Sequence, residues 1–447
     1  MNFKVLAILT LVTFSTAHAS VKAYFNQNQK SSYVEPYRNL HRSGDNLEAV
    51  VLEQIYAAKK SIYIAVQELR LPLIAKALVE KKKQGVDVRV VLEHDYNFTV
   101  ITQRDGQEAE YEATKRVDLF AFVDANGDGI ISRAELEDRD AIAILAKGKV
   151  PVIDDTSDGS RGSGLMHHKF AIIDGKSVVV TTANFTLSCV HGDYSVRESR
   201  GNANSMVVIQ SQAVAKIFDE EFSQLWGNGK RGNFGQRKSY RGRQTVSVRG
   251  VDITIQFSPT SARYNWEEST NGLVASQFAR ARSSIKAALF VYTDQKLSNV
   301  LEKMHDRNVH MGFLVEQKFA FRDYSELLDM AGIGMLNPKC SYEADNQPWK
   351  NPAKEIGVPQ LEKGDSLHHK FGVIDDSIVV MGSHNWSDAA NYINDETLVV
   401  IESKTVANQF AQEYRRLLKR SRMGVPDFVL QKIQNQEKAC SDVGSYF

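Results

Sequence analysis

Two hydrophobic periods alternate along the chain, one typical of helices and the other typical of strands. Stretches with apolar residues at helical spacing are separated by short runs of β-branched apolar residues. In the first half these segments fall at 47–58, 61–67, 71–83 and 86–92. Two further apolar runs, 169–173 and 177–181, are joined by Asp174-Gly175-Lys176, whose composition predicts a tight turn. This alternation predicts an α/β fold.

The order of segments occurs twice. Three blocks carry the repeat: 58–62 matches 281–285 at an offset of 223, 166–170 matches 367–371 at 201, and 207–209 matches 399–401 at 192. The falling offset places 22 additional residues between Glu93 and His167 and nine more after Asn184. We therefore predict two homologous α/β sandwich halves that pack about a pseudo-twofold axis within a monomer.

The first nineteen residues have the features of an export signal. Lys4 precedes an apolar run, and Ala17-His18-Ala19 supplies the small residues that a signal peptidase reads. The run is shorter than the ~20 apolar residues that span a bilayer, so we expect cleavage rather than a retained anchor. Residues 1–19 are therefore a predicted signal peptide, and the protein is expected to be secreted or periplasmic.

The repeat also places the predicted domain boundaries. The halves extend over 20–226 and 250–447, and the segment between them, 227–249, is rich in glycine and in basic residues. That composition predicts a linker. Two interpretations of its charge are open: a solvated basic connector, or a loop that contacts an anion.

Composition excludes several classes of protein. The 447 residues are 43% apolar and 24% charged, which is typical of globular proteins and unlike fibrous or disordered chains. There are 55 basic and 54 acidic side chains, and cleavage of the signal would remove one basic residue, Lys4, leaving a formal charge of zero. No overall field of one sign attracts nucleic acid or an anionic membrane.

The three cysteines are Cys189, Cys340 and Cys440. Export permits disulfides, and an odd count leaves at least one thiol unpaired. Cys340 and Cys440 both lie in late, polar segments, so we predict that they pair and that Cys189 is a small buried residue. The alternative is three free thiols.

Each half carries a histidine and a lysine two residues apart, His167 with Lys169 and His368 with Lys370. On a strand such residues share one face, so the following histidines, His168 and His369, point away. If the halves pack about a twofold axis, two imidazoles and two ammonium groups converge. Cationic and amide donors can stabilise the charge of a phosphoryl transition state. One imidazole can attack phosphorus and the other can protonate the leaving oxygen, without a metal.

At these positions the sequence resembles the phospholipase D superfamily, whose signature is H-x-K-x4-D followed by G-S-x-N. The second half keeps the full pattern, whereas the first has Thr181-Thr182-Ala183-Asn184 instead of the Gly-Ser start, and the Thr182 hydroxyl retains a plausible phosphate contact. The resemblance covers nearly the whole mature chain. It implies as catalytic residues His167, Lys169, Asp174, Asn184, His368, Lys370, Asp375, Ser383, Asn385 and Glu396.

The resemblance also implies roles for the two halves. His167 is the expected nucleophile, which forms a phosphohistidine, and His368 the expected acid that later activates water. Glu396 fits the acidic residue that orients an imidazole, but the sequence does not decide which histidine it orients. The aligned residue of the first half is Asn204, and either Asp193 or Glu198 is an alternative source of the missing carboxylate.

The additional segment of the first half contains an EF-hand-like loop at 124–135. Its predicted calcium ligands are the side chains of Asp124, Asn126, Asp128, Ser132 and Glu135 and the backbone carbonyl of Ile130. Gly129 supplies the sharp turn that this loop requires. The predicted ion is structural or regulatory, because the two-histidine chemistry does not need it.

Two substrate classes remain open on the sequence. A secreted phosphodiesterase that hydrolyses phospholipid head-group bonds at a membrane surface is favoured by export, zero mature charge and the predicted calcium loop. A secreted endonuclease is the alternative, because residues 58–92 resemble the small nucleases of the superfamily and the basic linker would track phosphates of nucleic acid. A non-catalytic binding protein is disfavoured, since both His-Lys pairs are intact.

Overall fold

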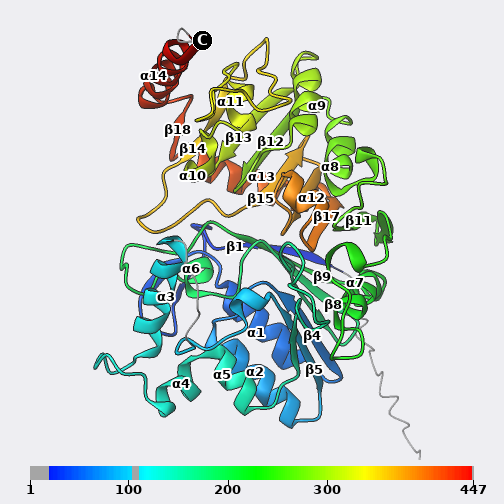
Figure 1. The fold of residues 1–447 in the computed structure, drawn as a ribbon. Helices are drawn as coiled ribbons and strands as arrows, with labels where there is room; N and C mark the ends of the chain where they lie inside the picture. Colours follow the sequence, from blue (N-terminus) through cyan, green and yellow to red (C-terminus); the bar gives the residue numbers. More distant parts are fainter. Residues whose placement is uncertain (1–19, 103–109, 445–447) are drawn as a thin grey trace, which may run out of the picture.

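Two β-sheets, one in each half of the chain, form the framework of the protein (Figure 1). The computed structural model describes residues 20–102 and 110–444. The predicted signal peptide at 1–19 lies outside these residues. Within the described part of the chain, no helix has the length and apolar composition required to cross a membrane.

The first sheet has seven strands in the order β1-β9-β8-β7-β4-β5-β6. They are β1 (Val21–Phe25), β4 (Ser61–Val66), β5 (Asp87–Leu92), β6 (Val152–Asp154), β7 (Lys169–Ile173), β8 (Ser177–Thr181) and β9 (Ser205–Gln210). Strands β4, β5 and β6 are mutually parallel, and the other neighbours are antiparallel. A separate hairpin pairs β2 (Ser32–Val34) with β3 (His41–Ser43).

The second sheet has nine strands in the order β10-β11-β17-β16-β15-β12-β13-β14-β18. They are β10 (Gln244–Val248), β11 (Val251–Ser258), β12 (Ser284–Leu289), β13 (His310–Val315), β14 (Glu355–Pro359), β15 (Lys370–Ile374), β16 (Ile378–Gly382), β17 (Glu396–Glu402) and β18 (Ser421–Met423). Its central order repeats that of the first sheet, with β17, β16, β15, β12, β13 and β14 in place of β9, β8, β7, β4, β5 and β6. The predicted duplicated α/β fold is therefore confirmed.

Helices cover both faces of each sheet. In the first half they are α1 (Leu47–Ala57), α2 (Pro72–Lys83), α3 (Glu110–Val123), α4 (Arg133–Arg139), α5 (Ala141–Lys147), α6 (Leu187–Val190) and α7 (Gln212–Trp226). In the second half they are α8 (Thr270–Phe278), α9 (Gln295–His305), α10 (Gln317–Ala320), α11 (Glu326–Met330), α12 (Asp388–Tyr392), α13 (Lys404–Leu418) and α14 (Asp427–Gly444). Helices α1, α2 and α5 lie together on the outer side of the first sheet (Figure 1).

One apolar core joins the two halves. It contains buried residues from both sheets and from α7 and α13. Phe170 packs edge-to-face on Phe218 with ring centroids 5.1 Å apart, and the repeated residues Phe371 and Phe410 pack at the same distance. Phe25 crosses between the halves and contacts Phe410 at 4.9 Å. Full burial of one such ring contributes about 1.5–3 kcal/mol, so the halves stabilise each other.

The segment predicted as a linker packs against the protein. Its last residues form β10, which pairs with β11. Lys238 is almost fully buried, and its Nζ forms ion pairs with Glu221 and with Asp395, the latter at 2.7 Å. Arg241 also pairs with Glu221, at 2.7 Å, and Arg237 pairs with Asp158. These three cations are neutralised by the protein's own carboxylates, whereas Lys230, Arg231, Arg243 and Arg249 are exposed, so the segment is a packed connector with a partly solvated charge.

The cysteine prediction is confirmed. Cys340 and Cys440 form a disulfide with Cα atoms 5.4 Å apart, and Cys189 is a buried free thiol. The disulfide ties α14 to the loop that follows α11. It therefore anchors the last helix, which projects from the edge of the second half (Figure 1).

Candidate active site

The two histidine–lysine pairs have the same local geometry. Each lysine is the first residue of a central strand, β7 or β15, and each histidine lies two residues earlier. Lys169 Nζ donates to the backbone oxygen of His167 at 2.9 Å, and Lys370 Nζ donates to that of His368 at the same distance. Both lysines are fully buried. The strand thus fixes each lysine, and a hydrogen bond links that lysine to the histidine just before the strand.

Reciprocal hydrogen bonds bring the two pairs together. The backbone N–H of His167 donates to Asp395 at 2.9 Å, and that of His368 donates to Ala203 at 3.0 Å. The preceding residues form matching bridges, Met166 with Asp395 and Leu367 with Ala203. Since each contact has its counterpart under exchange of the halves, the motifs meet at the pseudo-twofold axis.

Glu396 orients His167, which answers the question left open by the sequence. The imidazole Nδ1 lies 2.7 Å from Glu396 Oε2, and Ser383 Oγ donates to the same oxygen at 2.6 Å. Asn394 Nδ2 donates to the other oxygen at 3.3 Å. The glutamate belongs to the second half and the histidine to the first, so each half completes the site of the other. With Nδ1 held in this way, Nε2 is the nitrogen left for attack on a substrate.

Asn204 plays the corresponding part for His368. Its Oδ1 lies 3.0 Å from the imidazole Nδ1 and accepts a hydrogen bond from Thr182 Oγ1 at 2.8 Å. Asn204, rather than Asp193 or the exposed Glu198, therefore occupies the orienting position. The prediction omitted Asn204 from the site residues, although its alignment with Glu396 at the offset of 192 was a usable signal.

The hydroxyls of Ser383 and Thr182 do not face the site as expected. Both residues are fully buried, and each hydroxyl donates to the side chain that orients a histidine. The predicted direct contact of these hydroxyls with a phosphate is therefore wrong. They position Glu396 and Asn204 instead, and Thr can replace Ser because only the hydroxyl is needed.

The surroundings of the two lysines differ. Lys169 Nζ and Asn184 Nδ2 both donate to Gln67 Oε1, each at 3.2 Å. The residue at the same place in the second half is Phe290, whose ring centroid lies 4.8 Å from Lys370 Nζ. Phe290 also contacts the imidazole of His368 edge-to-face at 4.9 Å. Neither Gln67 nor Phe290 was predicted, because neither belongs to the motif.

The site favours a bound anion. Burial lowers the pKa of His167 well below its ordinary value, and the charges of Lys169 and Lys370 lower it further. The pKa of His368 is lowered by burial and by the same two lysines. Burial also lowers the pKa of Lys169, to about 8, and that of Lys370 well below its usual range. Four basic groups thus share one desolvated site, where a phosphate would offset their repulsion.

The two motif aspartates lie away from this group. Asp174 follows the far end of β7 and accepts hydrogen bonds from the backbone N–H groups of 59–61, at 2.7–3.1 Å. Asp375 holds the N–H groups of 282–284 in the same way, at 2.8–2.9 Å. The prediction that Asp174 and Asp375 are catalytic is therefore corrected: they fix the turns between each helix and the following central strand.

The loop at 124–135 connects α3 to α4. Asp124 accepts hydrogen bonds from the N–H groups of Gly127 and Gly129, both at 2.9 Å. Asn126 and Asp128 accept from the backbone two residues ahead, each at 2.8 Å. The predicted ligand side chains thus accept hydrogen bonds from the backbone of the same turn.

Two residues close this loop. Ser132 caps α4, and Glu135 reaches back to the N–H of Ala125 at 2.9 Å. The donor groups are oxygens, as calcium requires, while Ile130 contributes its carbonyl by prediction. Calcium binding stays a prediction.

The sequence is similar to a known protein family and to several characterised enzymes. A family model described as "Cardiolipin synthase, PLD-like domain" matches residues 51–226 and 274–418. Mitochondrial cardiolipin hydrolase of Mus musculus is 24% identical over 139 residues, which are 31% of this chain and 52% of that protein. The enzyme of Xenopus tropicalis is 21% identical over 138 residues, 31% of this chain and 56% of that protein. The chain thus spans about half the length of the curated relatives it matches.

Solved structures extend the similarity over both halves. Phosphatidylserine synthase of Haemophilus influenzae has a TM-score of 0.55 and 12% identity, over 89% of this chain and 92% of that one. Nuc of Salmonella typhimurium, a phospholipase D family member, aligns with 39% of this chain and 99% of its own at 20% identity and a TM-score of 0.30. The first comparison supports the two-sheet fold, whereas the second covers only 39% of this chain.

Proposed function

The chain belongs to the cardiolipin synthase, PLD-like domain family, and from that premise we propose that it is a secreted phosphodiesterase that hydrolyses the head-group bond of phospholipids through a phosphohistidine. The observation that carries the proposal is the paired site, in which Glu396 of one half orients His167 of the other. In the proposed complex two imidazoles, two lysines and the asparagines Asn184 and Asn385 surround the phosphodiester.

The first chemical step transfers the phosphatidyl group to the enzyme. His167 Nε2 attacks phosphorus, the bond to the head-group oxygen breaks, and protonated His368 gives its proton to that oxygen. Lys169, Lys370 and the two motif asparagines hold the non-bridging oxygens. A bound phosphodiester anion raises the pKa of His368, which the free site holds low, so substrate binding favours the protonated acid.

The second step returns the enzyme to its starting state. His368, now neutral, takes a proton from water, the water oxygen attacks phosphorus, and the N–P bond to His167 breaks. Phosphatidic acid leaves, and His368 is protonated for the next turnover. Because the phosphorylated imidazole carries a positive charge, the carboxylate of Glu396 suits His167 as nucleophile. The neutral amide of Asn204 suits a histidine that must release its proton.

A cavity in the first half supports a lipid substrate. It has a volume of about 210 Å³, and its largely apolar lining comes from α3, α6 and neighbouring loops. Leu119, Phe122 and Leu187 line it together with Lys115, whose charge lowers the pKa of His368. An apolar space that shares Lys115 with the surroundings of His368 suits the hydrocarbon part of a lipid better than a nucleotide.

Charge also favours the lipid over the nuclease alternative. Three of the seven basic residues of 227–249 that were candidates for tracking phosphates, Arg237, Lys238 and Arg241, are paired with carboxylates of the protein. A nuclease that contacts several phosphates needs unneutralised cations along its groove. The secreted location is a further part of the proposal, and the disulfide between Cys340 and Cys440 supports it, because such bonds persist in oxidising compartments.

The test compares two substrates with one preparation. Purified protein is incubated with cardiolipin or phosphatidylcholine vesicles and, separately, with plasmid DNA, and phosphatidic acid or nicked DNA is measured. We expect lipid hydrolysis that His167→Ala abolishes. DNA cleavage by a protein that is inactive on both vesicle types would replace the lipid proposal with the endonuclease alternative.

We also propose that the loop at 124–135 binds calcium with a stabilising role, since its oxygens gather around one turn next to α3. Addition of Ca²⁺ is expected to raise the melting temperature of wild-type protein but not of Glu135→Gln, because binding to the folded state stabilises it by mass action. Hydrolysis of a small soluble diester should stay unchanged when Ca²⁺ is chelated. Loss of that activity in protein that remains folded would contradict a purely stabilising role.

A further inference from the structure

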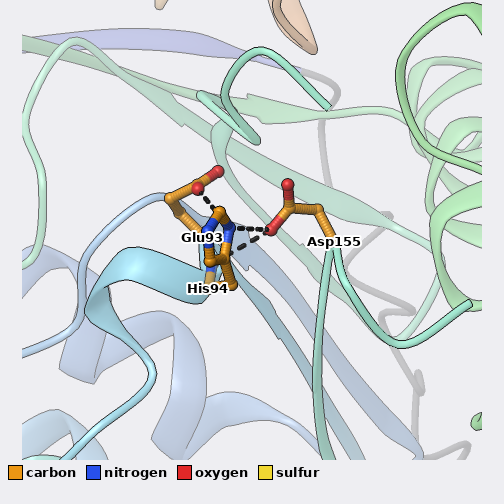
Figure 2. Close-up of side chains that lie close together, drawn as sticks. All are labelled: Glu93, His94 and Asp155. Atoms are coloured by element: carbon orange, nitrogen blue, oxygen red, sulfur yellow. Dashed lines mark hydrogen bonds and ion pairs between the residues drawn. The ribbon is translucent and has the colours of Figure 1, made fainter. Parts of the chain in front are cut away.

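A second cluster of ionisable side chains lies at the edge of the first sheet, outside the phosphodiester site. Glu93 directly follows β5, His94 begins a short 3-10 helix, and Asp155 directly follows β6. The parallel pairing of β5 with β6 brings these ends together. Figure 2 shows the imidazole between the two carboxylates.

The three side chains converge on one point. His94 Nδ1 lies 2.8 Å from Glu93 Oε1 and 3.0 Å from Asp155 Oδ1, and the three atoms lie within 4.8 Å of one another. Both carboxylate side chains are fully buried, whereas the imidazole is 32% exposed. One nitrogen can donate only one proton to two carboxylates, and Glu93 Oε1 accepts no hydrogen bond within the described residues. Two buried carboxylates therefore share a single imidazole.

The second half shows that the fold does not require this arrangement. Glu316 is the repeat of Glu93, and each accepts the N–H of the residue before its catalytic histidine, Leu367 at 2.7 Å and Met166 at 2.5 Å. The next residue, however, is Gln317 rather than histidine.

The second carboxylate is also absent from the repeat. In the strand pairing, Val152 of β6 corresponds to Ile356 of β14. Asp155 lies three residues after Val152, and the residue three positions after Ile356 is Pro359. The glutamate thus has a positioning role common to both halves. The first half alone adds an imidazole and a second carboxylate around its other oxygen.

The geometry points to a site for a divalent transition-metal ion, with Zn²⁺ as the best match, held by Glu93 Oε1, His94 Nδ1 and Asp155 Oδ1. Zinc binds imidazole and carboxylate at about 2.0–2.2 Å in tetrahedral geometry, so neighbouring ligand atoms are about 3.4 Å apart. The distances from Nδ1 to the two oxygens, 2.8 and 3.0 Å, are about half an ångström shorter, so small side-chain movements would admit the ion. A mixed nitrogen and oxygen donor set favours zinc over calcium, which prefers oxygen alone.

The ion would brace the approach to the catalytic strand. Glu93 holds Met166, the residue before His167, and Asp155 Oδ2 accepts the N–H of Ser163 at 2.8 Å. Ser163 Oγ in turn donates to Asp395 of the other half at 3.0 Å. The ion therefore ties two strand ends to the loop that leads into the site, without contact with the reacting groups. The inference is independent of the lipid assignment.

Metal content tests the inference directly. Full-length untagged protein is stripped of metal, incubated with Zn²⁺ in excess Ca²⁺ so that the loop at 124–135 is saturated, desalted, and analysed by mass spectrometry. We expect about one Zn²⁺ per chain in wild type and a rise in melting temperature on Zn²⁺ addition. His94→Gln, which introduces the residue of the second half, should lower the Zn²⁺ affinity by ~10–100-fold or more.

A matched control distinguishes binding from folding. Glu316→Gln alters the equivalent glutamate of the second half and should retain the zinc. Asp155→Asn keeps an oxygen acceptor for Ser163 but should lose the bound zinc. This second variant tests the site if His94→Gln does not fold. Wild type without zinc, or His94→Gln that retains it, would overturn the inference, the latter by placing the ion elsewhere. In the zinc-free case a proton would bridge the three groups instead.

Discussion

The two halves share a fold but give their catalytic histidines different partners. His167 is held by the carboxylate of Glu396, and His368 by the amide of Asn204, in otherwise matching hydrogen-bond chains. The lysines differ in the same way, with Gln67 beside Lys169 and Phe290 beside Lys370. The two halves thus share a symmetric frame, and different residues at equivalent positions give the two imidazoles different partners. The carboxylate stands where a cationic intermediate is expected.

The largest effect should come from removing either histidine. His167→Ala and His368→Ala each remove a reacting group, so turnover should fall by ~10²–10⁴-fold or more in protein with unchanged melting temperature. The comparison predicts different intermediates: acid quench should trap a phosphoryl adduct in wild type but not in His167→Ala. An adduct that persists in His167→Ala would exchange the roles of the two halves.

The orienting residues should differ in importance. Glu396→Gln removes the charge that offsets a phosphorylated imidazole, and we expect kcat to fall by about 10²-fold. Asn204→Ala removes a neutral hydrogen bond worth ~1 kcal/mol, so a loss of roughly fivefold is expected. Steady-state kinetics of both variants on one soluble diester make the measurement. Equal losses would mean that carboxylate and amide serve the same purpose and that the asymmetry has no chemical meaning.

The sequence predicted the frame better than the contacts. Offsets between repeated blocks were sufficient for the duplicated fold, and the apolar run at 169–173 was sufficient for the strand that begins at Lys169. The partner of an imidazole, however, depends on how the halves cross, and Glu396 reaches His167 only because Asp395 bridges to the other half. Composition alone suggested that Lys238 is a solvated cation, but tertiary packing buries it among carboxylates.

Motif membership was the weaker guide for the aspartates. Asp174 and Asp375 recur at a fixed spacing from the catalytic lysines, and spacing does not distinguish a reacting group from one that holds a turn. Each lysine is the first residue of a five-residue strand and its aspartate follows the last, so the two ends of β7 and β15 carry different tasks. Gln67 and Phe290 were missed for the opposite reason: they directly follow the neighbouring strands β4 and β12, outside any motif.

The pH dependence should report two lowered pKa values. Because kcat/KM reports the free enzyme, it should already fall as pH rises toward 6.5, where the general acid His368, whose pKa is lowered by burial and by the two lysines, loses its proton. It should fall again through about 8, where burial places the pKa of Lys169 and this ammonium loses its charge. The pKa of His167 lies below its ordinary value, so the neutral nucleophile should persist below pH 6.5. Rates from pH 5 to 10 on a soluble diester test both limbs. An acid limb at or above pH 6.5 would contradict the lowered histidine pKa.

The smallest effect on turnover should come from the two motif aspartates, where the halves are expected to behave alike. Asp174→Ala and Asp375→Ala each leave three backbone N–H groups without a carboxylate acceptor, and the neighbouring turns are partly exposed, so water replaces part of each interaction. We expect a loss of about 1–3 kcal/mol in the free energy of unfolding for each variant, and kcat within a few-fold of wild type. Denaturant unfolding and kinetics on the same samples make the comparison, and Asp376→Ala, one residue further along the second turn, is the matched surface control. An aspartate variant that keeps its stability but loses as much kcat as His167→Ala would show that the aspartate is catalytic after all. A loss of stability in only one of the two variants would show that the two repeated turns differ in their contribution to folding.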